Sequence, residues 1–195
     1  VFESHHEGLG LVARAWWTFS NEHGFVRTVS LEASGEHSCE VQALDALRDL
    51  QVGGASLPVM QSMSCLVNAY TRSERVGSTS LATFAMETAL SDRAEPAESL
   101  RATTAFAVGN GVSTLDPLAV ESFVQGEAFR RMHRSTGRAG LFAYFVEGQL
   151  GPGQSLSWAL VADVHRTQTQ VSALADQADG ISLSQLQAEA DAASE

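Results

Sequence analysis

The stretch LFAYFVEGQLGPGQSLSWALVAD, residues 141–163, decides the fold that this sequence predicts. It contains two apolar runs, residues 141–150 and 155–163, which are separated by Gly151-Pro152-Gly153-Gln154. Aromatic and β-branched side chains favour strands, and a cluster of glycine and proline favours a tight turn. The stretch therefore predicts two strong strands that pair as an antiparallel hairpin.

Strand patterns continue toward the N-terminus. Residues 9–20 are apolar and aromatic and predict one or two strands. Residues 25–32 and 38–44 alternate between apolar and polar side chains, which predicts two strands paired as a second hairpin. Residues 80–90 and 99–108 predict two further strands.

Helical patterns interrupt these strands. Leucines at three-residue spacing predict a helical turn over residues 44–50. Residues 57–75 and 116–134 each predict a helix with a proline near its first turn, where proline is well tolerated. Residues 167–178 predict a third helix, and residues 182–195 predict a terminal helix that fades into a polar connector.

Together these elements predict a mainly β protein, an antiparallel β-sandwich with a few inserted helices and a C-terminal linker helix. Six or more strands joined by short loops favour antiparallel pairing. We expect residues 1–165 to form the sandwich domain and residues 166–195 to form a helical linker toward a further domain. Both ends look cut, since the chain starts at Val1 and ends in the connector.

Composition and charge exclude several classes of partner. The chain has 195 residues, a formal net charge of −11 and a pI of about 4.9. Nucleic acids and anionic membrane surfaces both require a basic face, so neither is an expected partner. No apolar run approaches the roughly 20 residues that cross a bilayer. We therefore expect a soluble protein, located in the cytoplasm.

The residues that could bind a metal do not form a recognisable metal site. Cys39 and Cys65 are too few for a zinc site or a disulfide framework, so two buried free thiols are expected. In His5-His6-Glu7, adjacent side chains of a strand would face opposite ways, and we expect a flexible terminal cluster. No metal and no cofactor is expected.

The common catalytic patterns are incomplete. The chain has no Gly-x-Ser-x-Gly element for a serine nucleophile, and Gly109-Asn110-Gly111 is expected to be a hairpin turn and not a phosphate-binding loop. A mutarotase-like reaction needs a general acid and a general base, usually histidine and glutamate. His23, His133, His165 and Glu147 are the available residues, and their spacing does not pair them.

Aromatic residues are the best candidates for contact with a carbohydrate. Trp16, Trp17 and Tyr70 have the flat rings that pack on apolar faces such as those of a pyranose. In a strand only one of the two adjacent tryptophans can be available, because the other one faces the core. Asp92 and Glu95 belong to a charged cluster that is expected to be a solvated loop, with substrate contact as the alternative.

Several segments resemble one known family. FVRTVSLE (residues 25–32), VQALDALRDL (41–50), CLVNAYTRSE (65–74) and DRAEPAESLRATT (92–104) are similar, in this order, to segments of cellobiose-phosphorylase-like glycoside phosphorylases and hydrolases. Residues 144–163 are similar to the closing hairpin of the same domain. The resemblance covers most of residues 25–165.

Departures from the family pattern leave the subfamily open. Asn68 stands where aspartate is usual, Thr71 stands where lysine is usual, and Gln51-Val52-Gly53 stands where a leucine–proline pair is expected.

This resemblance implies a galactose-mutarotase-like β-supersandwich that precedes a linker helix and an (α/α)6 barrel. In that family the catalytic acid lies in the barrel, and no catalytic residue of the family maps onto this chain. The resemblance also implies a carbohydrate-active parent protein and the possibility of a homodimer. A free-standing carbohydrate-binding sandwich and a mutarotase-like epimerase are the alternatives. The sugar, the linkage and the choice between water and phosphate stay open.

Overall fold

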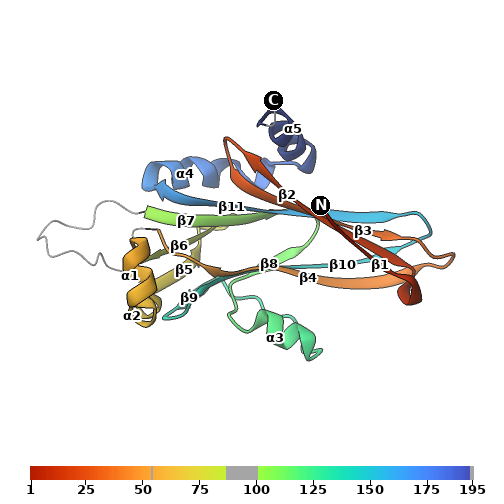
Figure 1. Cartoon of the computed structure of the whole chain (residues 1–195), viewed down its shortest axis with the longest axis horizontal. Helices are drawn as coiled ribbons and strands as arrows, with labels where there is room; N and C mark the ends of the chain where they lie inside the picture. The colour runs from red at the N-terminus through yellow and green to blue at the C-terminus, as the bar shows by residue number, and fades with distance from the viewer. Residues whose placement is uncertain (54, 87–100, 194–195) are drawn as a thin grey trace, which may run out of the picture.

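The computed structural model describes residues 1–53, 55–86 and 101–193, which form two antiparallel sheets packed face to face (Figure 1). Sheet A has eight strands in the order β1-β2-β3-β11-β7-β6-β5-β9, and sheet B has three in the order β4-β10-β8. The predicted mainly β, antiparallel sandwich is confirmed. The strand bounds are β1 Phe2–His6, β2 Leu11–Ser20, β3 Gly24–Ala33, β4 Cys39–Leu50, β5 Thr71–Arg75, β6 Ala82–Met86, β7 Arg101–Val108, β8 Val112–Thr114, β9 Arg134–Thr136, β10 Gly140–Leu150 and β11 Ser155–Thr167.

Helices lie on both outer sides of the sandwich. Figure 1 shows α4 and α5 over the outer face of sheet A, α3 on the far side of sheet B, and α1 and α2 at one end. Within the described residues, no helix has the length and apolar character needed to cross a membrane. The helix bounds are α1 Leu57–Ser62, α2 Ser64–Ala69, α3 Ala119–Val124, α4 Gln168–Gln177 and α5 Leu183–Ala193, with short 3-10 turns at Glu7–Leu9 and Ala178–Gly180.

The predicted hairpins at three turns are wrong, because the chain crosses from one sheet to the other at each of them. The turn at residues 151–154 joins β10 in sheet B to β11 in sheet A, and residues 34–38 join β3 in sheet A to β4 in sheet B. Gly109-Asn110-Gly111 joins β7 in sheet A to β8 in sheet B. Alternation of side chains shows which face of a strand is buried, and it does not show which sheet the strand joins.

The predicted helical turn at residues 44–50 is also wrong, since β4 continues to Leu50. Leu44 packs toward α3 on the outer face of sheet B, while Leu47 packs between the sheets. Asp49 has a positive φ of 54° and is the extra residue where the register with β10 shifts, so it forms a β-bulge. The bulge lets Leu50 pack on the inner face as well.

Two predicted helices are shorter than expected. The segment 57–75 forms α1 and α2, which are separated by the non-helical Met63, and then the strand β5. β5 lies between β6 and β9 in sheet A, and its residues Thr71 and Ser73 are buried. The segment 116–134 is helical only over α3, which ends before Gly126 with its φ of 72°, and Arg134 already belongs to β9. Tertiary pairing has overridden helical periodicity in both segments.

The strand that opens the deciding stretch is buried on both faces. Phe142 and Tyr144 on β10 point between the sheets, while Leu141 and Ala143 on the same strand pack beneath α3. A strand that is covered on both faces has a nearly continuous apolar sequence, which explains residues 141–146. The main core between the sheets joins these side chains to Phe84, Leu115, Val146, Trp158 and Leu160.

The two cysteines are free, but the expected burial of their thiols is wrong. Cys39 at the start of β4 is half-buried, and Cys65 in α2 is exposed. Burial was expected because free cysteines are among the most often buried residues. Cys39 lies at the end of an edge strand and Cys65 lies on the outer side of a short helix, so both positions remain open to solvent.

The segment that the sequence marked as a linker is packed against sheet A. α4 begins with a capping box in which the Thr167 hydroxyl accepts from the Gln170 backbone N–H. Leu174 of α4 and Leu186 of α5 are buried against outer-face residues of sheet A, such as Phe106 and Val161. The two helices therefore form a third layer of the fold.

A buried carboxylate connects the two sheets. Asp45 on β4 is 5% exposed, and its Oδ1 lies 2.6 Å from Nη1 of Arg27 on β3. Its Oδ2 accepts a hydrogen bond of 3.0 Å from the indole Nε1 of Trp158 on β11. Both oxygens of Asp45 are therefore bound to sheet A, and we call these three residues the inter-sheet clamp.

Replacing Asp45→Ala should destabilise the fold by about 3 kcal/mol, because it leaves a buried indole N–H without a partner and a partly buried guanidinium without its counter-ion. This is the low end for a broken buried pair, since the Arg27 side chain is 27% exposed. Urea unfolding followed by tryptophan fluorescence measures the loss. Glu40→Ala, which removes an exposed carboxylate from the same strand, should change stability by less than about 0.5 kcal/mol. Equal losses in both variants would contradict the clamp.

Candidate functional site

The two adjacent tryptophans lie on opposite faces of β2. Trp17 is paired across the strands with Arg27, whose side chain reaches Asp45 of sheet B, so Trp17 lies on the inner face of sheet A. Trp16 points to the outer face and is partly buried. Trp17 is 51% exposed although it lies on the inner face. Of the two candidates, Trp17 is the one that solvent reaches more freely.

Trp17 belongs to a larger apolar surface that the sequence did not predict. Phe19 and Phe25 are cross-strand partners on the same face, with ring centroids 5.6 Å apart and an interplanar angle of 79°. They are 50% and 51% exposed. The Arg27 guanidinium carbon lies 5.7 Å from the centroid of the Trp17 ring and occupies part of its surface. We call Trp17, Phe19 and Phe25 the aromatic strip.

The other carbohydrate candidates do not join Trp17. Tyr70 follows the last turn of α2 and is 39% exposed. It directly precedes β5, the seventh strand of sheet A, whereas β2 is the second strand, so Tyr70 and the aromatic strip are far apart. Asp92 and Glu95 lie outside the described residues. The structure therefore does not bring the five candidates together in one site.

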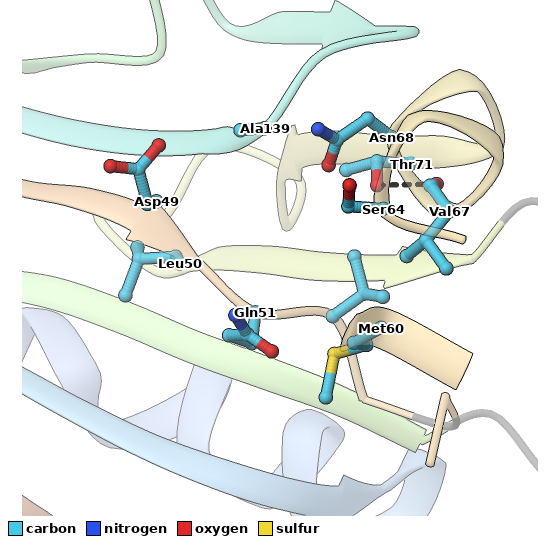
Figure 2. A pocket seen from close by; sticks show the side chains of 10 residues that line it. Asp49, Leu50, Gln51, Met60, Ser64, Val67, Asn68, Thr71 and Ala139 are labelled. Carbon is cyan, nitrogen blue, oxygen red and sulfur yellow. Dashed lines mark hydrogen bonds between the residues drawn. The ribbon is translucent and has the colours of Figure 1, made fainter. Parts of the chain in front are cut away.

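A small pocket with mixed polar and apolar lining lies where β4 ends beside α2. Figure 2 shows Asp49 on the β4 side of this pocket and Ser64, Asn68 and Thr71 on the α2 side, with the Thr71 hydroxyl donating to the Val67 carbonyl. Its volume is about 130 Å³, which is below the 300–1,000 Å³ typical of ligand sites. The pocket is lined by Asp49, Leu50, Gln51, Val52, Met60, Ser64, Val67, Asn68, Thr71 and Ala139.

A second cavity adjoins this pocket and shares Asp49, Asn68 and Ala139 with it. Its volume is about 450 Å³, and it adds the guanidinium groups of Arg48 and Arg138. Among the described residues that line either cavity, Asp49 is the single carboxylate. These groups can hydrogen-bond a hydroxylated or anionic ligand. Glycoside cleavage commonly needs two facing carboxyl groups, which this lining does not provide.

The residues considered for a mutarotase-like reaction are not brought together. His23 is 2% exposed in the turn between β2 and β3 of sheet A, whereas Glu147 is exposed on β10 of sheet B. His133 Nδ1 lies 3.2 Å from Nη1 of Arg75. His165 is exposed on β11 and has a φ of 58°. None of these histidines is paired with Glu147 in a described hydrogen bond.

His23 instead attaches the C-terminal helix to sheet A. Its Nδ1 lies 2.7 Å from Oε2 of Glu189 on α5, and the Ser20 hydroxyl donates to the same oxygen at 2.7 Å. An ionised carboxylate only accepts hydrogen bonds, so Nδ1 carries the proton in this contact. The His23 ring also packs against Phe106 in a T-shaped arrangement, with ring centroids 6.1 Å apart. We call Ser20, His23 and Glu189 the helix clasp.

Two residues of the clasp, together with Glu22, form the one group of described residues whose ligand atoms approach one another closely enough for a metal ion. Ligand atoms of Glu22, His23 and Glu189 all lie within 4.8 Å of one another. The Glu189 oxygen and the His23 nitrogen are already bound to each other, so we interpret the group as a structural contact. The predicted flexible cluster at His5-His6-Glu7 is wrong for His5 and His6, which belong to β1, where His5 bonds Glu3.

The Glu189 carboxyl has a shifted pKa. Partial burial raises its pKa, but hydrogen bonds from Ser20, His23 and Gln185 outweigh burial and hold the pKa below its ordinary value. A carboxyl with a lowered folded-state pKa stabilises the fold above its unfolded pKa of about 4.3. This contribution is lost as the pH falls through the lower, folded-state value.

Comparisons with known proteins do not place the chain in a family. A scan against protein-family models finds no match, and a search of curated proteins finds none either.

Glu189→Ala should loosen α5, because it leaves the buried His23 ring N–H without an acceptor, at a cost of about 1–3 kcal/mol. Hydrogen exchange should become faster over α5 and residues 20–24 at pH 7. The parent chain should show the same change only when the pH falls through the lowered pKa of the Glu189 carboxyl, below the ordinary pKa of a glutamate. Asp191→Ala removes an exposed carboxylate from the same helix and is the matched control. Unchanged exchange in Glu189→Ala would refute the clasp.

Proposed function

We propose that this chain is a non-catalytic β-sandwich domain of a carbohydrate-active enzyme, which supports an (α/α)6 catalytic barrel and shapes the entrance to its substrate site. The resemblance to cellobiose-phosphorylase-like proteins supports this proposal. Within the described residues, three of the segments that carry the resemblance lie in strands of the sandwich, and residues 65–74 run from α2 into β5. Residues 25–32 lie in β3, residues 41–50 in β4, and residues 144–163 in β10, the following turn and β11.

The single observation that carries the proposal is that polar side chains from three of these segments bind one another between the two sheets. Arg27 of the first segment, Asp45 of the second and Trp158 of the closing segment together form the inter-sheet clamp. The carboxylate of Asp45, which is buried, thus has a structural role. Asp49, the carboxylate at the two adjoining cavities, has no second carboxyl group among the described lining residues. Two adjoining cavities whose described lining has no acid–base pair fit a supporting domain.

Turnover assays test the proposal. The purified chain should not hydrolyse aryl glycosides and should not cleave disaccharides in the presence of phosphate, because the described lining of the two adjoining cavities offers Asp49 without a second carboxyl group. Release of nitrophenol, and of free sugar or sugar phosphate, are the measurements. Asp49→Asn serves as the diagnostic variant. Turnover by the parent chain that Asp49→Asn abolishes would overturn the non-catalytic assignment.

A free-standing carbohydrate-binding sandwich is the second candidate. The half-exposed Trp17 favours it, since a rigid aromatic ring on a strand is a suitable surface for stacking a sugar. Arg27 next to the ring could donate hydrogen bonds to hydroxyl groups. The mutarotase-like alternative has less support, because its histidines and Glu147 lie apart.

The second candidate makes its own prediction. Titration calorimetry with gluco-oligosaccharides should give binding that Trp17→Ala abolishes and that Tyr70→Ala leaves unchanged, because Tyr70 lies near β5 at the other end of the sheet order. Heats no larger than those of dilution for every oligosaccharide would remove this candidate. The turnover assays would be unaffected, so the two proposals fail independently.

A further inference from the structure

The two sheets of the sandwich are unequal, and sheet A extends past the edge of sheet B. β4 is an edge strand of 12 residues that pairs with β10 on one side. Among the described residues, its other side has no strand partner. Such an edge presents a row of backbone N–H and C=O groups that can pair with a further strand.

The inter-sheet clamp shows what lies opposite this edge. Asp45 contacts Arg27 on β3 and Trp158 on β11, so β4 lies over these two strands of sheet A. The next strands of sheet A on that side are β2 and β1. The position beside β4 therefore lies over the region in which β2 carries Trp17 and Phe19.

The aromatic strip is the apolar surface of this uncovered region. Its three side chains are each about half exposed, although they point to the same face as the main core. The open edge of β4 and the exposed aromatic strip are two independent observations that one additional strand would explain. Its backbone would form hydrogen bonds with β4, and its apolar side chains would cover the strip.

We propose that an additional extended β-strand pairs with the open edge of β4 and covers the aromatic strip. This inference goes beyond the proposed function and does not rest on it. The occupant is a polypeptide segment with alternating side chains, apolar on the face toward Trp17, Phe19 and Phe25. Its opposite face is polar, like the exposed Glu40 and Gln42 of β4. Strand addition of this kind uses main-chain bonds for affinity and alternate side chains for selectivity.

Other kinds of occupant would meet only one of these two requirements or would clash. A helix or a sugar could cover the aromatic rings, but neither could pair with the backbone of β4. A second copy could pair β4 with β4 in an antiparallel, two-fold arrangement. Both copies would then place sheet A on the same side of the joined sheet, and both overhangs, β1 and β2, would occupy the same space. A separate strand meets both requirements without this clash.

A peptide with the sequence of β10 is a suitable probe, because β10 already pairs with the other edge of β4. In the fold, Phe142, Tyr144 and Val146 point from β10 toward sheet A. The same alternation would place these side chains on the aromatic strip. The probe is GLFAYFVEGQL with two lysines added at each end for solubility. Two control peptides have the same sequence with N-methyl groups on alternate residues. One carries them on the odd-numbered positions and the other on the even-numbered positions, so each peptide lacks the backbone N–H donors of one strand edge.

Hydrogen exchange of the intact chain measures the result. The probe should slow exchange over residues 39–50, and one of the two N-methyl peptides should lose this effect. Trp17→Ser and Phe25→Ser should each weaken binding by about tenfold, because each removes an aromatic contact. Val124→Ser, which changes an 80% exposed side chain on α3, should leave binding unchanged.

Four results would overturn the proposal. The first is unchanged exchange over β4 at saturating probe, and the second is equal binding by both N-methyl peptides. The third is a dimer in light scattering with β4 already protected, which would make a second copy the occupant. The fourth is sugar binding that depends on Trp17 while the probe does not bind, which would assign the strip to carbohydrate.

Discussion

The carboxylate of Asp45 is bonded on both oxygens to sheet A while its backbone belongs to sheet B. A buried charge is tolerated only where its partners are held in place, so this contact fixes where the two sheets can sit relative to each other. Once β4 is fixed over β3 and β11, β10 and β8 follow as its neighbours in sheet B. The extent of the core, and the part of sheet A that is left uncovered, are consequences of that position.

The sequence was most informative about which segments are strands and least informative about where they go. Side-chain alternation identified residues 25–32, and apolar runs identified 141–150 and 155–163, because these residues are buried in a periodic way. The partners of a strand depend on contacts that are more than a hundred residues apart, such as β3 with β11. A glycine–proline turn such as residues 151–154 fits a crossing between sheets as well as a hairpin. The helix expected at residues 71–75 failed for a similar reason, since β6 and β9 pair with this segment from both sides.

The surface residues were predictable only in part. The rule that adjacent residues of a strand face opposite ways was sufficient to separate Trp16 from Trp17. It could not show that Trp17 stays exposed on the inner face, because that depends on the width of the opposing sheet. Phe19 and Phe25 were missed although both lie next to the turn at residues 21–23. Counting residues along both strands away from that turn places Phe19 opposite Phe25, and this would have revealed the aromatic strip.

Most connections between consecutive strands pass from one sheet to the other, as at residues 34–38, 109–111 and 151–154. Neither sheet can therefore be completed while the other is still unformed, and both the longest strand pairing, β4 with β10, and the pairing of β3 with β11 join distant parts of the chain. Proteins dominated by non-local pairings fold slowly, in milliseconds to seconds, because much chain entropy is lost before the contacts form. The alternating path thus makes the sandwich a single cooperative folding unit. During synthesis, β3 must wait for β11, more than a hundred residues later, before the sheet around it closes.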